Sequence, residues 1–221
     1  MKSVVTGGAG FIGSNLVDQL VYKGHKVIVL DNFSTGRQSN LSHHTKKNVK
    51  IINIDISANK KLDKYFKGVS YVFHLSGLAD IVPSIENPNA YFQSNVKGTL
   101  NILEASKKTN IKKLIYAASS SCYGIPDKYP TDEQSKIDPK YPYALSKFLG
   151  EQLIIHWAKV YKMPNLSLRF FNAYGPRSRT TGVYGAVFGT FLAQKLAKKP
   201  LTIVGDGRQT RDFVHVKDLV S

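Results

Sequence analysis

The sequence predicts a doubly wound α/β fold, in which helices cover both faces of a mostly parallel sheet. Three observations lead to this fold class. Short runs rich in β-branched residues alternate with longer segments of helical period. The runs are nearly all apolar, as expected of strands that are covered on both faces. A glycine-rich turn joins the first run to the first helical segment.

The expected elements, taken in order, divide the chain into two regions. Strands are expected at residues 3–6, 26–30, 49–53, 71–75, 113–118 and 166–170, and helices at residues 12–23, 90–109 and 143–161. After Asn172 the sequence becomes rich in Gly, Arg and Thr, before a helix at residues 186–198, a short strand at 201–204 and the start of a helix at 218–221. We therefore expect one main domain over residues 1–165 and a smaller region over residues 166–221.

Charge and composition narrow the classes of partner. The formal net charge is +16, but the lysines are scattered as short pairs, so we expect no nucleic-acid partner. Cys122 is the only cysteine, which fits a reducing, cytoplasmic setting. With neither a signal peptide nor an apolar run of about 20 residues, no membrane partner is expected. His43 and His44 lie in a polar stretch without a partner at ligand spacing, which favours a solvated loop and no metal site.

The turn after the first strand has the features of a phosphate-binding loop. Gly7, Gly10 and Gly13 stand in the segment TGGAGFIG, which opens the first helix. Glycines permit a tight turn and let backbone N–H groups approach a pyrophosphate at the positive end of a helix. Asp31 ends the second strand, 18 residues after Gly13, where a carboxylate can bind ribose hydroxyls and repel a 2′-phosphate. NAD is therefore favoured over NADP, although Lys26 and Arg37 nearby keep NADP open.

A second set of residues suggests acid–base chemistry. Tyr143 and Lys147 are four residues apart, so on a helix they lie on the same face. A tyrosine that acts as a base near pH 7 needs its pKa lowered by about three units, or about 4 kcal/mol, which a nearby cation helps to supply. Ser119 begins a serine triplet directly after a strand, at the carboxyl edge where ligands bind in open α/β sheets.

Together these motifs resemble the extended short-chain dehydrogenase/reductase family, with its Rossmann-type fold, and in particular its UDP-sugar 4-epimerase branch. Further matching segments are HLSG at 74–77, NVKGT at 95–99, RFFN at 169–172 and GDGRQTRDF at 205–213. The resemblance covers essentially the whole chain. The chain stops at 218–221, whereas the family continues for a substantial C-terminal stretch, so the resemblance also implies that the sequence is truncated.

The resemblance implies roles for individual residues. Tyr143 would be the catalytic base, with Lys147 and Ser119 as its catalytic partners. The implied cofactor-binding residues for NAD are Gly7, Gly10, Phe11, Ile12, Gly13, Asp31, Asn32, Asp55, Ile56, Leu75, Ser76, Gly77, Asn95, Tyr143, Lys147 and Phe170. The implied substrate-binding residues are Ala79, Asp80, Ser119, Ser120, Asn172, Val187, Thr202, Ile203, Val204 and Arg211.

The implied activity is inversion of C4 of a UDP-hexose by transient oxidation, with NAD tightly bound throughout and a homodimer as the assembly. Two alternatives stay open. One is a dehydratase or reductase of a nucleotide sugar, although the related dehydratases carry an Asp-Glu pair after the strand that here ends in three serines. The other is a catalytically silent NAD-binding sensor, which would have no need for Ser119, Tyr143 and Lys147 together.

Overall fold

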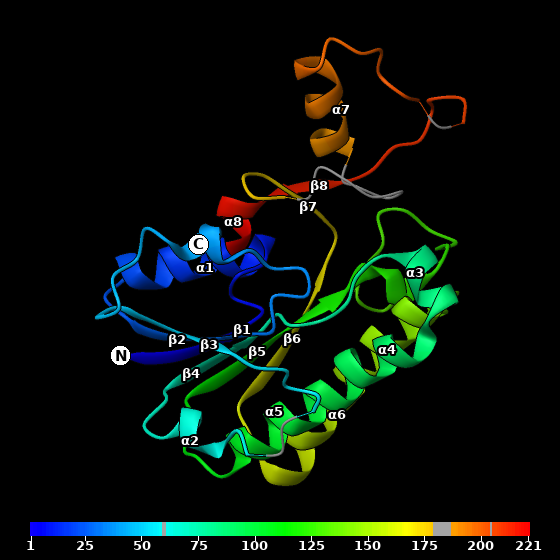
Figure 1. The fold of residues 1–221 in the computed structure, drawn as a ribbon. Helices are drawn as coiled ribbons and strands as arrows, with labels where there is room; N and C mark the ends of the chain where they lie inside the picture. The colour runs from blue at the N-terminus through cyan, green and yellow to red at the C-terminus, as the bar shows by residue number, and fades with distance from the viewer. Residues whose placement is uncertain (59–60, 179–186, 204) are drawn as a thin grey trace.

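In a computed structural model, the chain forms one six-stranded parallel sheet with helices on both faces, and a small second sheet beside it (Figure 1). The structure describes residues 1–58, 61–178, 187–203 and 205–221. The strands of the large sheet are β1 (Lys2–Thr6), β2 (Lys26–Asp31), β3 (Val49–Asn53), β4 (Tyr71–His74), β5 (Lys113–Ser119) and β6 (Asn165–Phe170). Their order is β3-β2-β1-β4-β5-β6, and every neighbouring pair is parallel. The doubly wound prediction is confirmed.

Two apolar clusters hold helices on opposite faces of the sheet. On one face α1 (Phe11–Tyr22) buries Leu16, Val17 and Leu20 against β1 and β2, and α8 (Val216–Val220) packs beside it. On the other face lie α2 (Asp63–Phe66), α5 (Gly98–Lys107) and α6 (Pro142–Tyr161), with Phe66, Ile102 and Ile154 fully buried. The short helices α3 (Ile81–Glu86) and α4 (Pro88–Phe92) also contact α6 (Figure 1). Among the described residues, no helix is both long and apolar enough to cross a bilayer.

The small sheet pairs β7 (Asn172–Tyr174) with β8 (Phe213–His215). Above it, α7 (Val187–Leu196) places Phe188 against Tyr174, with ring centroids 4.6 Å apart. Leu192 and Leu196 of the same helix are 56% and 76% exposed, so α7 packs against its surroundings through one edge only. The boundary expected at residue 165 falls at the start of β6, and the small sheet follows in the second region.

The structure corrects the expected helix over residues 90–109. It is divided into α4, a π-helical turn at Gln93–Lys97 and α5. The wider turn carries Asn95, which is 1% exposed and bonds both the N–H and the C=O of Leu78, at 2.8 and 3.0 Å, as well as the Ser146 hydroxyl. The helical period alone could not predict this inward-facing amide, since it depends on a loop 17 residues earlier in the sequence.

The strand expected at 201–204 is wrong over Leu201–Ile203, which is irregular, and Val204 lies outside the described residues. The backbone N–H of Thr202 donates to the side chain of Gln194 in α7 at 3.1 Å. This side-chain acceptor takes the place of a strand partner. The three-residue strands β7 and β8 were not predicted from the sequence, since each is shorter than the runs on which the strand prediction depended.

A buried polar column connects β1, β4 and α5. His74 is completely buried, and its Nδ1 and Nε2 lie 2.7 and 2.9 Å from the hydroxyls of Thr6 and Thr99. Burial, with a contribution from the charge of Lys147, lowers the pKa of His74 to about 3. The folded protein therefore holds this imidazole in its neutral form.

The burial of neutral His74 leads us to expect that the folded protein loses stability in acid. Between pH 6.5 and 3 the unfolded chain takes up a proton at His74 that the folded chain excludes, so the free energy of unfolding falls as the pH falls. At pH 4.5 the linkage amounts to about 3 kcal/mol. We expect His74→Asn, which keeps polar atoms at this position, to lose this part of the acid sensitivity in urea unfolding at pH 7 and 4.5. His156→Asn, at an exposed site on α6, is the control, and equal pH dependence of both variants would contradict the assignment.

Candidate active site

A cleft of about 310 Å³ opens at the carboxyl edge of the sheet, where β1 and β4 diverge to their crossover connections. In open α/β folds this is the position at which ligands bind. The loops after the first four strands form its walls. Most of the residues implied as cofactor contacts line it: Gly7, Gly10, Phe11, Ile12, Gly13, Asp31, Asn32, Asp55, Ile56, Leu75, Ser76 and Gly77. Ala79 and Asp80, implied as substrate contacts, also lie in this wall.

The glycine turn is shaped by close backbone approaches. Gly7 has φ +67°, and a Cβ at this position would lie 2.8 Å from the N atom of Ser76. A Cβ at Gly13 would lie 2.1 Å from the Gly7 carbonyl oxygen. These two positions therefore require glycine. A side chain at Gly7 would push the turn away from the segment after β4, and one at Gly13 would push the turn away from α1.

The turn presents hydrogen-bond donors to the cleft. α1 begins at Phe11, directly after Gly10, which carries no side chain that could cap the helix. The N–H groups of the first turn of a helix have no acceptor within that helix, and they lie at its positive end. Because Phe11, Ile12 and Gly13 line the cleft, this end of α1 fits a phosphate group.

Asp31 braces the same turn. Its side chain is held by two backbone N–H groups, from Ala9 to Oδ2 at 2.9 Å and from Phe33 to Oδ1 at 2.8 Å. The residue is only 6% exposed. A carboxylate has about four acceptor sites, so Asp31 can also accept hydrogen bonds from the hydroxyls of a ribose. The residues present therefore fit the adenosine diphosphate half of a dinucleotide.

A second, larger cleft of about 1360 Å³ continues from the first, and Ala79 and Ala173 line both. It contains further residues that the sequence analysis singled out: Ser119, Ser120, Tyr143, Phe170, Asn172 and Arg211. Phe170, implied as a cofactor contact, lies in this second wall. Asn172 donates from Nδ2 to the carbonyl oxygen of Asp212 at 2.9 Å, which ties the start of β7 to the segment before β8.

The hydroxyls of Tyr143 and Ser119 meet in this second cleft. Tyr143 donates to Ser119 Oγ at 3.2 Å, and Ser119 Oγ lies 2.8 Å from Ser121 Oγ. Burial raises the pKa of Tyr143, the hydrogen bond with Ser119 partly offsets this, and the charge of Asp80 raises the pKa further. Tyr143 is therefore protonated near neutral pH, and a nearby cation is needed to favour the phenolate that could act as a base.

Lys147 lies one helical turn from Tyr143 on α6, beneath the wall of the first cleft. It is 7% exposed, and a Cβ built on Gly77 would lie 3.7 Å from its Nζ. Burial lowers the pKa of Lys147 to about 7, although the negative charge of Glu151 opposes this shift. The ammonium also lies 4.4 Å from the ring centroid of Tyr116, a cation–π contact that favours the charged form. Near neutral pH, Lys147 can therefore hold a proton or release it.

Some predicted residues are not among those that line either cleft. Asn95 and Lys147 stand behind Gly77, while Val187, Thr202 and Ile203 belong to the exposed part of the second region. The dinucleotide cleft also contains residues that sequence reasoning missed: Ser34, Thr35, Ile54, Leu78, Ser94, Ala117, Ala173 and Ser178. Ser34 and Thr35 could have been found, because they follow Asn32 in the loop after a strand. The second cleft likewise adds Ser121, Tyr123, Gly124, Ile125, Pro126, Tyr129, Pro130, Thr131 and Phe171.

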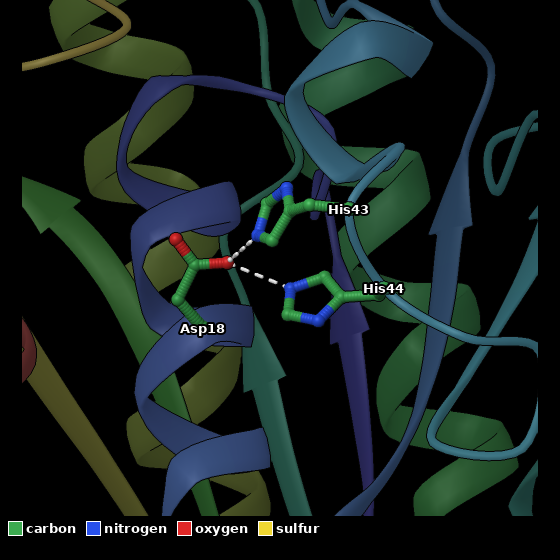
Figure 2. Close-up of side chains that lie close together, drawn as sticks. All are labelled: Asp18, His43 and His44. Atoms are coloured by element: carbon green, nitrogen blue, oxygen red, sulfur yellow. Dashed lines mark hydrogen bonds and ion pairs between the residues drawn. The ribbon is translucent and has the colours of Figure 1, made fainter.

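The two adjacent histidines have a partner that the sequence did not reveal. Both His43 and His44 bond Asp18 of α1, which lies 25 and 26 residues earlier (Figure 2). The side chain of His43 is 49% exposed, in keeping with a solvated loop, but that of His44 is only 9% exposed. The interpretation as a solvated loop is therefore wrong for His44.

The fold and the site together define a dinucleotide-binding protein of the extended short-chain dehydrogenase/reductase class. Residues 3–221 match the NAD dependent epimerase/dehydratase family. The chain belongs to this family.

Individual relatives cover the whole of this chain. A UDP-glucose 4-epimerase of Mycolicibacterium smegmatis is 36% identical over 227 residues, spanning 100% of this chain and 71% of that protein. The UDP-N-acetylglucosamine 4-epimerase of Methanobrevibacter ruminantium, solved with UDP-N-acetylmuramic acid, superposes with a TM-score of 0.95 at 38% identity, covering 99% of this chain and 70% of that one. UDP-glucuronic acid decarboxylase 4 of Arabidopsis thaliana is 38% identical over 226 residues, 100% of this chain and 49% of that protein.

Proposed function

We propose that the protein is a UDP-hexose 4-epimerase, which inverts C4 by oxidising it and reducing it again with NAD that stays bound. The observation that carries the proposal is the 3.2 Å hydrogen bond between Tyr143 and Ser119, in a cleft that continues from the dinucleotide cleft along Ala79 and Ala173. A sugar in the second cleft would then lie between the hydroxyl pair and the cofactor. The names of the epimerase relatives support the same activity.

The proposed chemistry divides the work between the two clefts. NAD held in the first cleft would supply the hydride acceptor and donor for C4. Tyr143 would remove the proton of the 4-hydroxyl in the oxidation and give it back to the same oxygen in the reduction, and Ser119, with its bond to Ser121, would position both hydroxyls. The positive charge of Lys147, one turn away, would favour the phenolate that burial disfavours. Arg211, in the second cleft, would bind the diphosphate of the substrate.

Two related activities give different products. Elimination of water needs an acid–base pair beside the sugar, and here the positions after Ser119 are the hydroxyls of Ser120 and Ser121, which favours epimerisation. Decarboxylation is the second related activity, because one of the relatives of this chain is a UDP-glucuronic acid decarboxylase.

Incubation with UDP-glucose, UDP-N-acetylglucosamine and UDP-glucuronate, with products resolved by NMR, separates these activities. We expect a mixture of C4 epimers from at least one substrate. Formation of a UDP-pentose or of a 4-keto-6-deoxy sugar in its place would overturn the proposal.

The discrimination between NAD and NADP tests the role of Asp31. Replacing Asp31 by alanine removes the acceptor for the ribose hydroxyls and the charge that repels a 2′-phosphate, so NAD affinity should fall about tenfold and the preference over NADP should decrease. Ala9 and Phe33 also lose their acceptor, which costs about 1–3 kcal/mol of stability. Calorimetric titration with NAD and with NADP gives the ratio of the two affinities. A general loss of stability would weaken both affinities and leave their ratio unchanged. An unaltered ratio would contradict the role of Asp31.

The homodimer is implied by the family resemblance, whereas the cytoplasmic location and the absence of membrane and nucleic-acid partners are expected from composition. All of these stay predictions, and sedimentation analysis of the purified protein can check the dimer.

A further inference from the structure

Three ligand-type side chains converge outside both clefts. Asp18 comes from the second turn of α1, and His43 and His44 come from the loop between the 3₁₀ turn at Gln38–Leu41 and β3 (Figure 2). The Nε2 atoms of the two imidazoles lie 2.8 and 2.7 Å from the same carboxylate oxygen, Asp18 Oδ1. All three potential ligand atoms lie within 4.8 Å of one another. We propose that Asp18, His43 and His44 form a binding site for one divalent transition-metal cation of the Zn²⁺ type.

The donor set selects the class of ion. Two imidazole nitrogens and one carboxylate oxygen suit Zn²⁺, Co²⁺ or Ni²⁺, whereas Mg²⁺ and Ca²⁺ prefer oxygen ligands alone. Bonds of about 2.1 Å in a tetrahedron place ligand atoms about 3.4 Å apart. The present oxygen–nitrogen distances of 2.7 and 2.8 Å would have to open by about 0.6 Å, which small rotations of the side chains supply. The ion would take the place of the Nε2 protons, and each neutral imidazole would carry its proton on Nδ1.

The backbone that carries the imidazoles is fixed in place. Leu41 is 1% exposed and anchors the loop in the core, and the N–H of His44 donates to its carbonyl oxygen at 3.1 Å. The His44 side chain is mostly covered, while that of His43 is half exposed, which leaves a path for the ion and for the water that completes a tetrahedron.

Arg177 orients the carboxylate and also limits the affinity. Its Nη2 lies 2.8 Å from Asp18 Oδ2, so this oxygen is occupied and Oδ1 faces the imidazoles. In metal sites, the side chains that bind the ion are typically held by further hydrogen bonds, as Arg177 holds Asp18. The positive charge of the guanidinium also repels a cation. We therefore expect weaker binding than at a closed structural zinc site.

The position of the site gives the ion a structural effect. Arg177 belongs to the segment after β7, which also contacts α1 where Asn15 Nδ2 donates to the carbonyl oxygen of Pro176 at 3.1 Å. The connection from β2 to β3, which carries His43 in its second half, also contains Ser34 and Thr35 before the 3₁₀ turn. Ser34, Thr35 and Ser178 line the first cleft. An ion on Asp18 would link the outer wall of that cleft to α1 without touching the residues proposed for catalysis.

The test uses tag-free, chelator-treated protein at pH 7.5. We expect one Zn²⁺ per chain by calorimetry, a Co²⁺ absorption spectrum of a four-coordinate site, and a thermal midpoint that rises with Zn²⁺. His43→Ala, at the half-exposed ligand, and the double variant His43→Ala/His44→Ala should bind at least tenfold more weakly and lose the thermal shift. His156→Ala, which removes an exposed histidine elsewhere, is the matched control and should bind normally.

Two outcomes would overturn the proposal. One is the failure of the wild-type protein to bind either ion. The other is equal binding by the wild-type protein and the double variant. Because His43 is exposed, its alanine variant keeps the fold and remains informative even where changes at Asp18 disturb α1.

Discussion

Replacing Tyr143 by phenylalanine is expected to reduce epimerase turnover by about 10²–10⁴-fold, the contribution typical of a positioned acid–base group. The substitution removes one hydroxyl and keeps the ring, which lies edge-on to Tyr91 with centroids 6.3 Å apart. Ser119 keeps its bond to Ser121, so no polar group is left without a partner by the change. The first cleft, which does not include Tyr143 among its lining residues, should bind NAD as before.

The matched control is Tyr141→Phe, which removes a hydroxyl from an exposed tyrosine two residues earlier, at the start of α6. Turnover by NMR and NAD affinity by fluorescence should both be unchanged in this control. Near-normal turnover in Tyr143→Phe would refute the proposed base, and loss of NAD binding would show that the residue acts on the cofactor instead.

Gly13→Ala is expected to lower NAD affinity by about 10–100-fold. A Cβ at this position would lie 2.1 Å from the Gly7 carbonyl oxygen and 2.9 Å from the Gly7 carbonyl carbon, so the backbone itself has to move. Overpacking of this kind costs about 1–3 kcal/mol, and tenfold in affinity corresponds to about 1.4 kcal/mol. The part that moves is the turn proposed to hold the pyrophosphate, so the cost should appear in binding as well as in the free energy of unfolding.

Gly98→Ala is the comparison, because it also places a methyl group in a helix at a glycine. There the new Cβ would lie 3.2 Å from side-chain atoms of Ile56, which lines the same cleft but can turn aside without a movement of the backbone. We expect its NAD affinity to stay within about threefold of the wild-type value, because the glycine turn is unchanged. Its free energy of unfolding should gain about 0.5–1 kcal/mol from the helix propensity of alanine. Equal affinities of the Gly13 and Gly98 variants would mean that the turn adapts to a side chain.

The sequence was informative where structure is determined locally. The six strands of the large sheet lie within one residue of their predicted bounds. The central strands β1 and β2 are buried at most positions, and β2 is largely apolar, as strands covered on both faces are. The edge strand β6 is only partly buried. The placement of the glycine turn, Asp31 and Ser119 at the carboxyl edge could also be predicted, because the turn directly follows β1 and the two residues end β2 and β5.

The remaining features depend on contacts between distant segments. The π-helical turn places Asn95 against Leu78, and the pairing of β7 with β8 joins two short segments nearly 40 residues apart along the chain. The meeting of His43 and His44 with Asp18 requires the loop to dock on α1. Neither hydrophobic period nor motif spacing encodes such contacts, so the small sheet of the second region and the cluster of Asp18, His43 and His44 emerged only from the structure.

The short β7–β8 ladder fixes the position of the strand residues and leaves the length of the chain between the two strands free to vary. Its three paired positions, from Asn172↔Phe213 to Tyr174↔His215, close the chain between them into a large loop. The entropy of closing such a loop grows only logarithmically, and doubling its length costs about 0.6 kcal/mol. A change of length in the stretch between α7 and β8 should therefore cost little, while Ser119 and Asn172 keep their place in the strands. Because residues 208–212 of this stretch line the second cleft, such a change would alter a wall of that cleft and leave the large sheet as it is.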